Sequence, residues 1–203
     1  MIRKIVHTSL NIVAAKSYTP YQDLENKAML ADLLETPNMF IDHIRRYSNS
    51  LTTQLVFGFR TTSIHDPKFK QLFSGFQQFA EVTAKQMAAT LDLFPVLRSL
   101  PDFLLPLRRY AKKLHKAESE LYVGHWLRVK QSIKHGTARP CFCVDLFRAQ
   151  DEYKFSDLLA SYISGTLLEA GSDTTAATLL GCRSTPPLLK RAQTLTHPKS
   201  CKP

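Results

Sequence analysis

The sequence predicts an all-α protein built around one helical domain. Apolar side chains recur every three or four residues through most of the chain, the spacing that lines one face of a helix. Glycine occurs only seven times in 203 residues, which is too few for the many tight turns of a β-rich fold. No segment gives a strand signal, so the helices are expected to pack on one another.

Local signals place the helix boundaries. Pro20 and the pair Asp66-Pro67 suit helix starts, because Asp can cap a helix and Pro fits its first turn, whereas Gly58 suits a helix end. Helices are expected at residues 1–15, 21–34, 40–57, 67–80, 106–135, 144–149 and 155–181. Apolar core faces are expected on three of them: Leu24, Ala28, Ala31 and Leu34; Phe40, Ile44, Tyr47, Leu51 and Leu55, followed by Phe59; and Phe69, Leu72, Phe73, Phe76 and either Phe79 or Ala80.

The chain is basic, with a formal net charge of +10. Part of that charge forms a stripe on the expected helix 106–135: Arg108, Arg109, Lys112, Lys113 and Lys116. Leu107, Leu114 and Leu121 occupy its opposite, core-facing side, together with Tyr110. Nucleic acid, lipid head groups and plain solvent are all possible neighbours of such a stripe. No aromatic residues interleave with the charges as base-stacking platforms would, which favours solvent.

Other features limit the class of protein. No secretory signal and no run of eighteen apolar residues is found, so no membrane span is expected. The proline-punctuated apolar segment 91–106 is interpreted either as buried beneath a lid or as a contact with a membrane surface. The four cysteines form no C-x-x-C pair, so a metal site is not predicted and free thiols are expected.

The segment 155–181 carries the chemistry. Its ends favour a helix, but Gly171 to Thr175 are five poor helix formers in succession, at a cost of roughly 3 kcal/mol relative to alanine. Gly171 permits a close approach to the backbone, and the Thr174 hydroxyl can donate to the carbonyl of Ala170 one turn earlier. Asp173 places an ionisable group, a proton source, beside that hydroxyl.

The hexapeptide 170–175 resembles the oxygen-activation motif of the haem-thiolate monooxygenases, the cytochrome P-450 family. That motif reads Ala or Gly, Gly, any residue, Asp or Glu, Thr, and then Thr or Ser, within a long central helix. The order of elements over residues 1–181 is also similar to that family, in its eukaryotic and fungal form, from its third helix onward. The resemblance implies a partial cytochrome P-450 fold with haem as cofactor.

The resemblance also implies roles for individual residues. Thr174 would donate a hydrogen bond to iron-bound dioxygen, and Asp173 would relay protons to it. Ala170 and Gly171 would line the groove over the haem, and Arg3 would contact a haem propionate. The complete enzyme would insert one oxygen atom from dioxygen into an apolar organic substrate, with electrons from an NADPH-dependent reductase, at the endoplasmic reticulum membrane.

The chain departs from the family pattern in two motifs. The E-x-x-R helix and the F-x-x-G-x-R-x-C-x-G loop, which supplies the thiolate ligand, are missing, and no N-terminal membrane anchor is expected from the opening residues. Cys141, Cys143, Cys182 and Cys201 lie in no such loop. The chain alone is therefore expected to be inactive and to carry no metal ligand. The alternative is a non-catalytic helical fragment with at most a binding role.

The last residues differ in character from the rest. Residues 182–203 are basic, contain several prolines and show no apolar stripe, so they are expected to form a disordered tail after a domain at 1–181. Altered splicing or a shifted reading frame is the hypothesis for this change. A third functional class, a basic helical module for nucleic acid or membrane, remains open, with peripheral membrane contact favoured over nucleic acid and no specific oligomer predicted.

Overall fold

The computed structural model describes residues 2–9, 18–83 and 106–183. These residues form helices and contain no strand, so the all-α prediction is confirmed. The helices are α1 (Ile2–Ser9), α3 (Thr19–Glu35), the short 3-10 helix η2 (Pro37–Met39), α4 (Phe40–Phe57), α5 (Pro67–Thr83), α7 (Pro106–Lys134), α8 (Phe142–Tyr153) and α9 (Asp157–Arg183).

The local boundary signals act as expected. The Asp66 carboxylate accepts hydrogen bonds from the backbone N–H groups of Lys68 (2.8 Å) and Phe69 (3.2 Å), which caps α5. Gly58 ends α4 in the left-handed conformation, with φ 78°, and its N–H donates to the carbonyl of Gln54. Helix α9 continues two residues beyond the expected end at Gly181.

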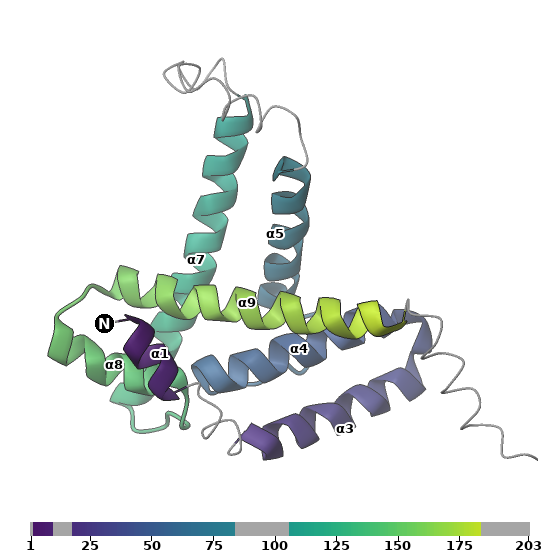
Figure 1. Cartoon of the computed structure of the whole chain (residues 1–203), viewed down its shortest axis with the longest axis horizontal. Coiled ribbons are helices and arrows are strands. Elements are labelled where there is room, and N and C mark those ends of the chain that lie inside the picture. Colours follow the sequence, from purple (N-terminus) through teal and green to yellow (C-terminus); the bar gives the residue numbers. More distant parts are fainter. Residues whose placement is uncertain (1, 10–17, 84–105, 184–203) are drawn as a thin grey trace, which may run out of the picture.

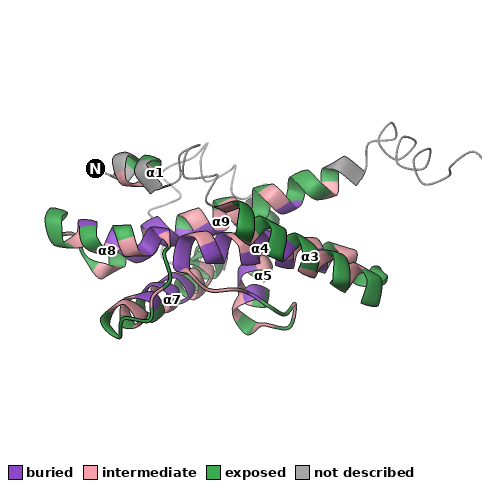
Figure 2. Cartoon of the chain, turned by 90° about the horizontal axis from the view of Figure 1, so that it is seen from below, coloured by how far each residue is buried: buried purple, intermediate pink, exposed green. Residues whose placement is uncertain are grey.

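Helix α4 lies at the centre of the arrangement. It runs between α3 and α9 and packs on both (Figure 1). Helix α7 crosses α9, and α5 lies alongside α7. Helix α8 packs against α1 near the beginning of α9. Buried residues gather where α4, α8 and α9 meet (Figure 2).

The apolar core lies where α4, α5, α7, α8 and α9 come together. Trp126 of α7 and Leu146 of α8 are fully buried, and Leu168 of α9 is 1% exposed. Around them lie Val56, Phe57, Leu72, Leu121, Val129, Phe142, Ala160 and Ile163. On α5, Phe69 and Leu72 are buried as expected, but Phe79 near the far end is 62% exposed.

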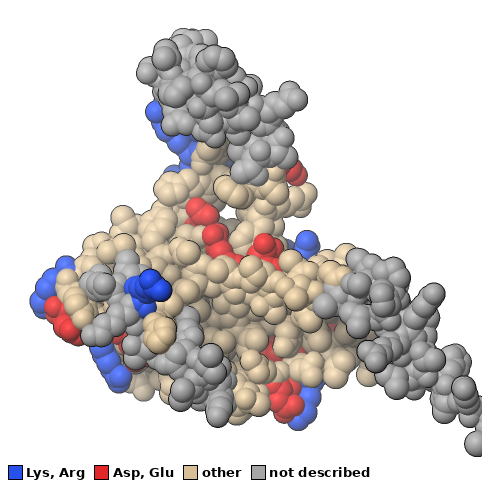
Figure 3. Space-filling view, in the orientation of Figure 1, with Lys and Arg blue, Asp and Glu red and all other residues tan. Residues whose placement is uncertain are grey.

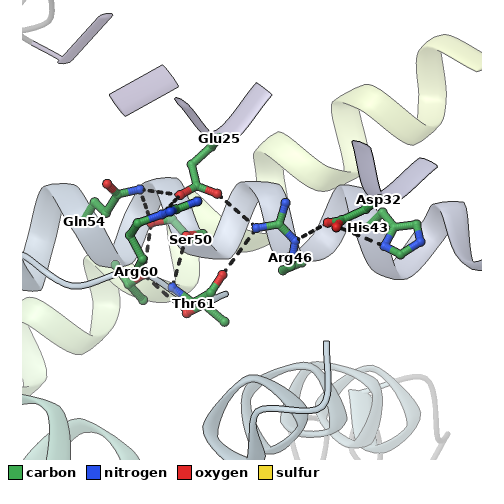
Figure 4. Close-up of polar contacts among 9 residues, drawn as sticks. Glu25, Asp32, His43, Arg46, Ser50, Gln54, Arg60 and Thr61 are labelled. Carbon is green, nitrogen blue, oxygen red and sulfur yellow. Dashed lines mark hydrogen bonds and ion pairs between the residues drawn. The ribbon is translucent and has the colours of Figure 1, made fainter. Parts of the chain in front are cut away.

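The predicted core face of α3 is wrong. Leu24 and Leu34 are 44% and 86% exposed, whereas the buried residue of this helix is Glu25, with no exposed surface. Its carboxylate accepts hydrogen bonds from Arg46 (3.0 Å), Gln54 (2.8 Å) and Arg60 (Figure 4). Helix α3 therefore docks on α4 through charge pairs, which apolar periodicity does not detect.

Helix α4 differs from its prediction for the same reason. The apolar stripe that includes Ile44, Leu51 and Leu55 is only half-buried. Packing between two other helices instead buries polar side chains: His43, Arg46, Ser48, Asn49, Ser50, Thr52, Thr53 and Gln54. Some of these groups bond to a neighbouring helix, as Arg46 does to Glu25 of α3 and Ser48 to the Gly171 and Ser172 carbonyls of α9. Thr52 and Thr53 instead donate to carbonyls of α4 itself, and both kinds of bond offset lost hydration.

The basic stripe of α7 is exposed, as predicted: Arg108, Arg109, Lys112, Lys113 and Lys116. Leu121 is buried and Leu114 is half-buried, but Tyr110, expected on the apolar side, is 37% exposed. The side chain of Leu107, most of the segment 91–106 and the tail 184–203 lie outside the described residues. None of the helices described is both long enough and apolar enough to cross a bilayer.

Candidate active site on helix α9

The hexapeptide 170–175 lies within an unbroken stretch of helix α9. The Thr174 hydroxyl donates to the carbonyl of Ala170, the hydrogen bond expected from the sequence. Thr178 repeats the pattern one turn later and donates to the carbonyl of Thr174 at 2.8 Å. These bonds give the hydroxyls a partner in the helix while leaving both side chains at the surface.

One face of the hexapeptide packs against α4. A Cβ atom on Gly171 would lie 2.7 Å from the Thr52 side chain, so glycine is required for this close approach. The Ser48 hydroxyl donates to the carbonyls of Gly171 (3.0 Å) and Ser172 (2.7 Å), and Asn49 donates to the Ser172 hydroxyl at 3.2 Å. These bonds offset part of the low helix propensity of the segment.

The opposite face of the hexapeptide is open. Ala170, Asp173 and Thr174 are exposed, and so is Ala177 one turn further along. The structure therefore brings three of the predicted site residues together on one surface, with a carboxylate beside a hydroxyl between two small apolar side chains. Gly171 lies on the side that faces α4, and the exposed Arg3 belongs to α1, which packs against α8.

An acidic pair, Glu118 of α7 and Glu169 of α9, lies next to this surface where the two helices cross. Burial raises the pKa of Glu169 to about 7, and so do a hydrogen bond with Glu118 and repulsion from Glu118 and Asp173, whereas a hydrogen bond from Tyr122 lowers it. Burial, Glu169 and Glu118 raise the pKa of Tyr122 far above its usual range. Acidic side chains are visible over this crossing in Figure 3.

The described thiols are poor metal ligands. Cys143 is completely buried in the core, and burial raises the pKa of its thiol well above the ordinary value. Burial also raises the pKa of the Cys141 thiol. Both side chains are free cysteines that favour the neutral form, and within the described ranges no three His, Cys, Asp or Glu side chains are placed to hold a metal ion.

The family assignment follows from comparison with known proteins. The cytochrome P-450 family model matches residues 2–181. This chain belongs to the cytochrome P-450 family. It is 55% identical over 181 residues to cytochrome P-450 monooxygenase fogE of Aspergillus ruber, covering 89% of this chain and 34% of that protein. It is 48% identical over 180 residues to cytochrome P-450 monooxygenase virE of Hypocrea virens, covering 89% of this chain and 33% of that protein.

A third relative gives the same result. Cytochrome P-450 monooxygenase fsoB of Humicola fuscoatra is 46% identical over 179 residues, which cover 88% of this chain and 34% of that protein. The chain thus spans about a third of the length of the curated relatives it matches. These relatives bear out the resemblance read from the hexapeptide.

The family implies a haem group, and the described residues fit only part of its surroundings. Ala170, Thr174 and Ala177 form an exposed, small-residue wall that a flat apolar ring can approach. The two described thiols do not suit a metal ligand, because burial raises the pKa of both and favours the neutral form. If haem is bound beside this wall, a thiolate ligand would come from residues other than these two.

The sequence did not reveal Glu118. It lies between Leu114 and Leu121 of α7 and comes close to Glu169 only because the two helices cross. The one local signal was an acidic residue inside an otherwise apolar stripe of α7.

Proposed function

We propose that residues 157–181 form the distal, oxygen-activating helix of a haem-dependent monooxygenase. In the complete protein the reaction would place one oxygen atom of dioxygen into an apolar substrate, with electrons from an NADPH-dependent reductase. Bound haem, with a thiolate supplied by another segment, would provide the oxidising chemistry. The observation that carries the proposal is the exposed trio Ala170, Asp173 and Thr174 on one surface of α9.

Thr174 is proposed to hold and position a proton. Its Oγ1 already donates to the Ala170 carbonyl, so the hydroxyl is oriented and its oxygen remains available to accept a second hydrogen bond. Rotation about one side-chain bond would turn the same proton from the helix toward a ligand on the exposed surface. Ala170 and Ala177, with only methyl groups, leave room for that ligand above and below the hydroxyl.

Asp173 is proposed to resupply the proton. Its carboxyl is exposed and adjacent in sequence to Thr174, so it can exchange protons with water and pass them along a short path. Glu169 lies one turn away, and burial beside Glu118 and Asp173 raises its pKa to about 7, so its carboxyl is proposed as a second proton donor for this surface.

A chimeric enzyme tests the proposal. Residues 2–181 of this chain would replace the matching third of the Aspergillus ruber monooxygenase, which keeps that protein's own remaining segments. The chimera is expected to bind haem, to show the long-wavelength Soret band of a thiolate-ligated haem when reduced with carbon monoxide, and to consume NADPH with a reductase. A chimera that folds and binds haem but produces no oxygenated product with any substrate of the parent enzyme would count against the proposal.

A further inference from the structure

We propose that a groove between the turn after α4 and the turn after α7 binds the phosphate group of a phosphomonoester through Arg60, Arg128 and Arg139. The phosphate can belong to a soluble molecule or to a lipid head group, because both present the same anion. The inference goes beyond the proposed function, since it involves none of the residues proposed to handle oxygen. Its test requires no haem and stands or falls separately.

The groove has the size and lining of an anion site. It holds about 350 Å³, a volume within the range of small-molecule sites. The three arginines line it, and none of its lining residues is acidic. The turn after α7 lies close to Gly58, where an added Cβ atom would be 3.3 Å from the carbonyl oxygen of Arg139. This close approach of the two turns brings Arg60 and Arg139, distant in sequence, to one groove.

The arginines of the groove have donors to spare. In the part of the chain that the structure describes, neither Arg128 nor Arg139 forms an ion pair with a carboxylate. Arg60 holds Glu25 through its Nε (Figure 4), and its terminal nitrogens donate to no described residue. A guanidinium has five N–H donors, so most of the donors in the groove have no protein partner there.

The segments outside the described ranges carry little negative charge. Their only acidic residues are Asp92 and Asp102, whereas Lys and Arg are more numerous in the same segments. Both acidic residues belong to the segment that joins α5 to the beginning of α7 at Pro106. Pro106 lies about 33 Å along the helix from Arg128, so the chain leaves and re-enters the described structure far from the groove.

Aromatic stacking orients Arg128 before any ligand binds. Its guanidinium lies over the ring of Phe59, 4.2 Å from the ring centre. Phe59 in turn stacks on Phe57 at 5.7 Å and on His125 at 5.3 Å, so the ring is held from behind. Stacking uses the flat face of a guanidinium and leaves the N–H groups at its edge available to an oxyanion.

A buried imidazole beside the groove has an unused nitrogen. His125 is 4% exposed, and its Nδ1 has no hydrogen-bond partner among the described residues. It lines a small cavity of about 30 Å³ that shares Phe59, Arg60 and Arg128 with the groove. An unpaired polar atom at such a depth indicates a place where a further molecule or ion completes the hydrogen bonding.

The same place has an excess of positive charge. Burial, Lys68 and Arg128 lower the pKa of His125 to about 3, and burial and Arg128 also lower the pKa of Lys68. The acidic residue of the small cavity, Asp66, raises the pKa of Lys68 but also accepts the capping hydrogen bonds of α5. A bound anion would reduce the mutual repulsion of these cationic groups.

The number of arginines favours phosphate over carboxylate. A phosphomonoester carries close to two negative charges at pH 7 and has three terminal oxygens, so it can accept hydrogen bonds from several guanidinium groups at once. A carboxylate carries one charge and two oxygens that suit one guanidinium fork. A neutral or cationic molecule would leave the repulsion in the groove uncompensated.

Phenyl phosphate and benzoate, which share a ring and differ in the anion, test the class of ligand. Each would be titrated into the full 203-residue chain, labelled with nitrogen-15, in salt of about 0.15 M to screen general attraction to a basic protein. Phenyl phosphate is expected to shift the backbone NMR signals of residues 57–60, 128–132 and 137–139, with benzoate at least about tenfold weaker. Benzoate binding as tightly as phenyl phosphate would overturn the inference.

Vesicles distinguish the two sources of the phosphate. Phosphatidic acid presents a phosphomonoester at a lipid surface, whereas phosphatidylglycerol, at matched surface charge, presents a phosphodiester. Binding of phenyl phosphate identifies a soluble ligand, and preferential binding of phosphatidic acid vesicles without phenyl phosphate identifies a lipid head group; either supports the inference. If phenyl phosphate does not bind and the two kinds of vesicle bind equally or not at all, the inference is wrong.

Matched variants locate the site. Arg128→Gln and Arg139→Gln each remove one guanidinium, so each should weaken the bound phosphomonoester at least about tenfold. Arg109→Gln removes the same charge from an exposed position near the other end of α7 and should change binding less than about twofold. Helical circular dichroism would verify folding, and Arg139, exposed in a turn, provides the test if Arg128→Gln unfolds. Equal weakening by Arg109→Gln, or unchanged binding in folded Arg139→Gln, would contradict the inference.

Discussion

Removing the charge of Glu25 should destabilise the protein strongly. Glu25 has no exposed surface, and its carboxylate receives hydrogen bonds from Arg46, Gln54 and Arg60. Glu25→Gln keeps the shape of the side chain but places an amide against two guanidinium groups. Arg46, 2% exposed, retains its ion pair with Asp32 at 2.8 Å. Breaking a buried pair costs 3–5 kcal/mol, and the retained partner favours the lower end, about 3 kcal/mol.

Urea unfolding at pH 7, followed by helical circular dichroism, measures this loss. The control is Glu35→Gln at the exposed end of the same helix, which should change the free energy of unfolding by less than about 0.5 kcal/mol.

Burial alone would raise the pKa of Glu25, but hydrogen bonds from Arg60, Arg46 and Ser50 together hold it below its usual value. The stabilisation is therefore present at neutral pH and lost as acid protonates Glu25. Equal unfolding midpoints for Glu25→Gln and wild type at pH 7 would refute the buried network.

Three further predictions concern α9 and the cysteines. Gly171→Ala should destabilise the fold by about 1–3 kcal/mol, because the added methyl group clashes with α4. Gly181→Ala, in open space on the same helix, should not destabilise it. Thermal unfolding compares the two variants, and an equal loss of stability in both would contradict the close contact at Gly171. Hydrogen bonds from Lys130 and Gln150 lower the pKa of Asp157 from 3.8 to about 2. The ionised carboxylate therefore stabilises the fold above about pH 4, and this stabilisation is lost as the pH falls through about 2. The midpoint of thermal unfolding should depend less on pH over that range in Asp157→Asn than in the wild type. The 203-residue chain alone, mixed with haem, reduced and treated with carbon monoxide, should give no thiolate-type Soret band. None of its four cysteines lies in the family's thiolate loop, and burial holds the Cys141 and Cys143 thiols neutral. That band would show that a cysteine of this chain is the ligand.

Helix positions were predictable because their signals are local. Asp66 with Pro67 begins α5, and Gly58 ends α4. The hydrogen bonds at these two helix ends span at most four residues, so neighbouring residues in the sequence suffice to predict them. The buried face of α3 was not predictable in the same way. Glu25 is buried only because Arg46 and Arg60, more than twenty residues later, are brought to it by folding.

The candidate site likewise has features that local sequence predicts and features that depend on how distant helices pack. The bond from Thr174 to Ala170 and the close approach at Gly171 follow from residue type and helical spacing, although the sequence does not say that the approaching group is Thr52. The acidic pair Glu118 and Glu169 depends on how α7 and α9 cross, and no spacing within one helix encodes a crossing.

The measurement that tests the central claim most directly compares Thr174→Ala with Thr178→Ala in the chimeric enzyme. Both threonines are exposed on α9 and both donate to the carbonyl four residues earlier, so the two variants lose the same local bond. The quantity to measure is the fraction of consumed NADPH that appears as oxygenated product rather than hydrogen peroxide. Thr174→Ala should lower that fraction at least about fivefold while Thr178→Ala retains it. Equal coupling in the two variants would contradict the assignment of the exposed face of α9 as the oxygen-activating surface.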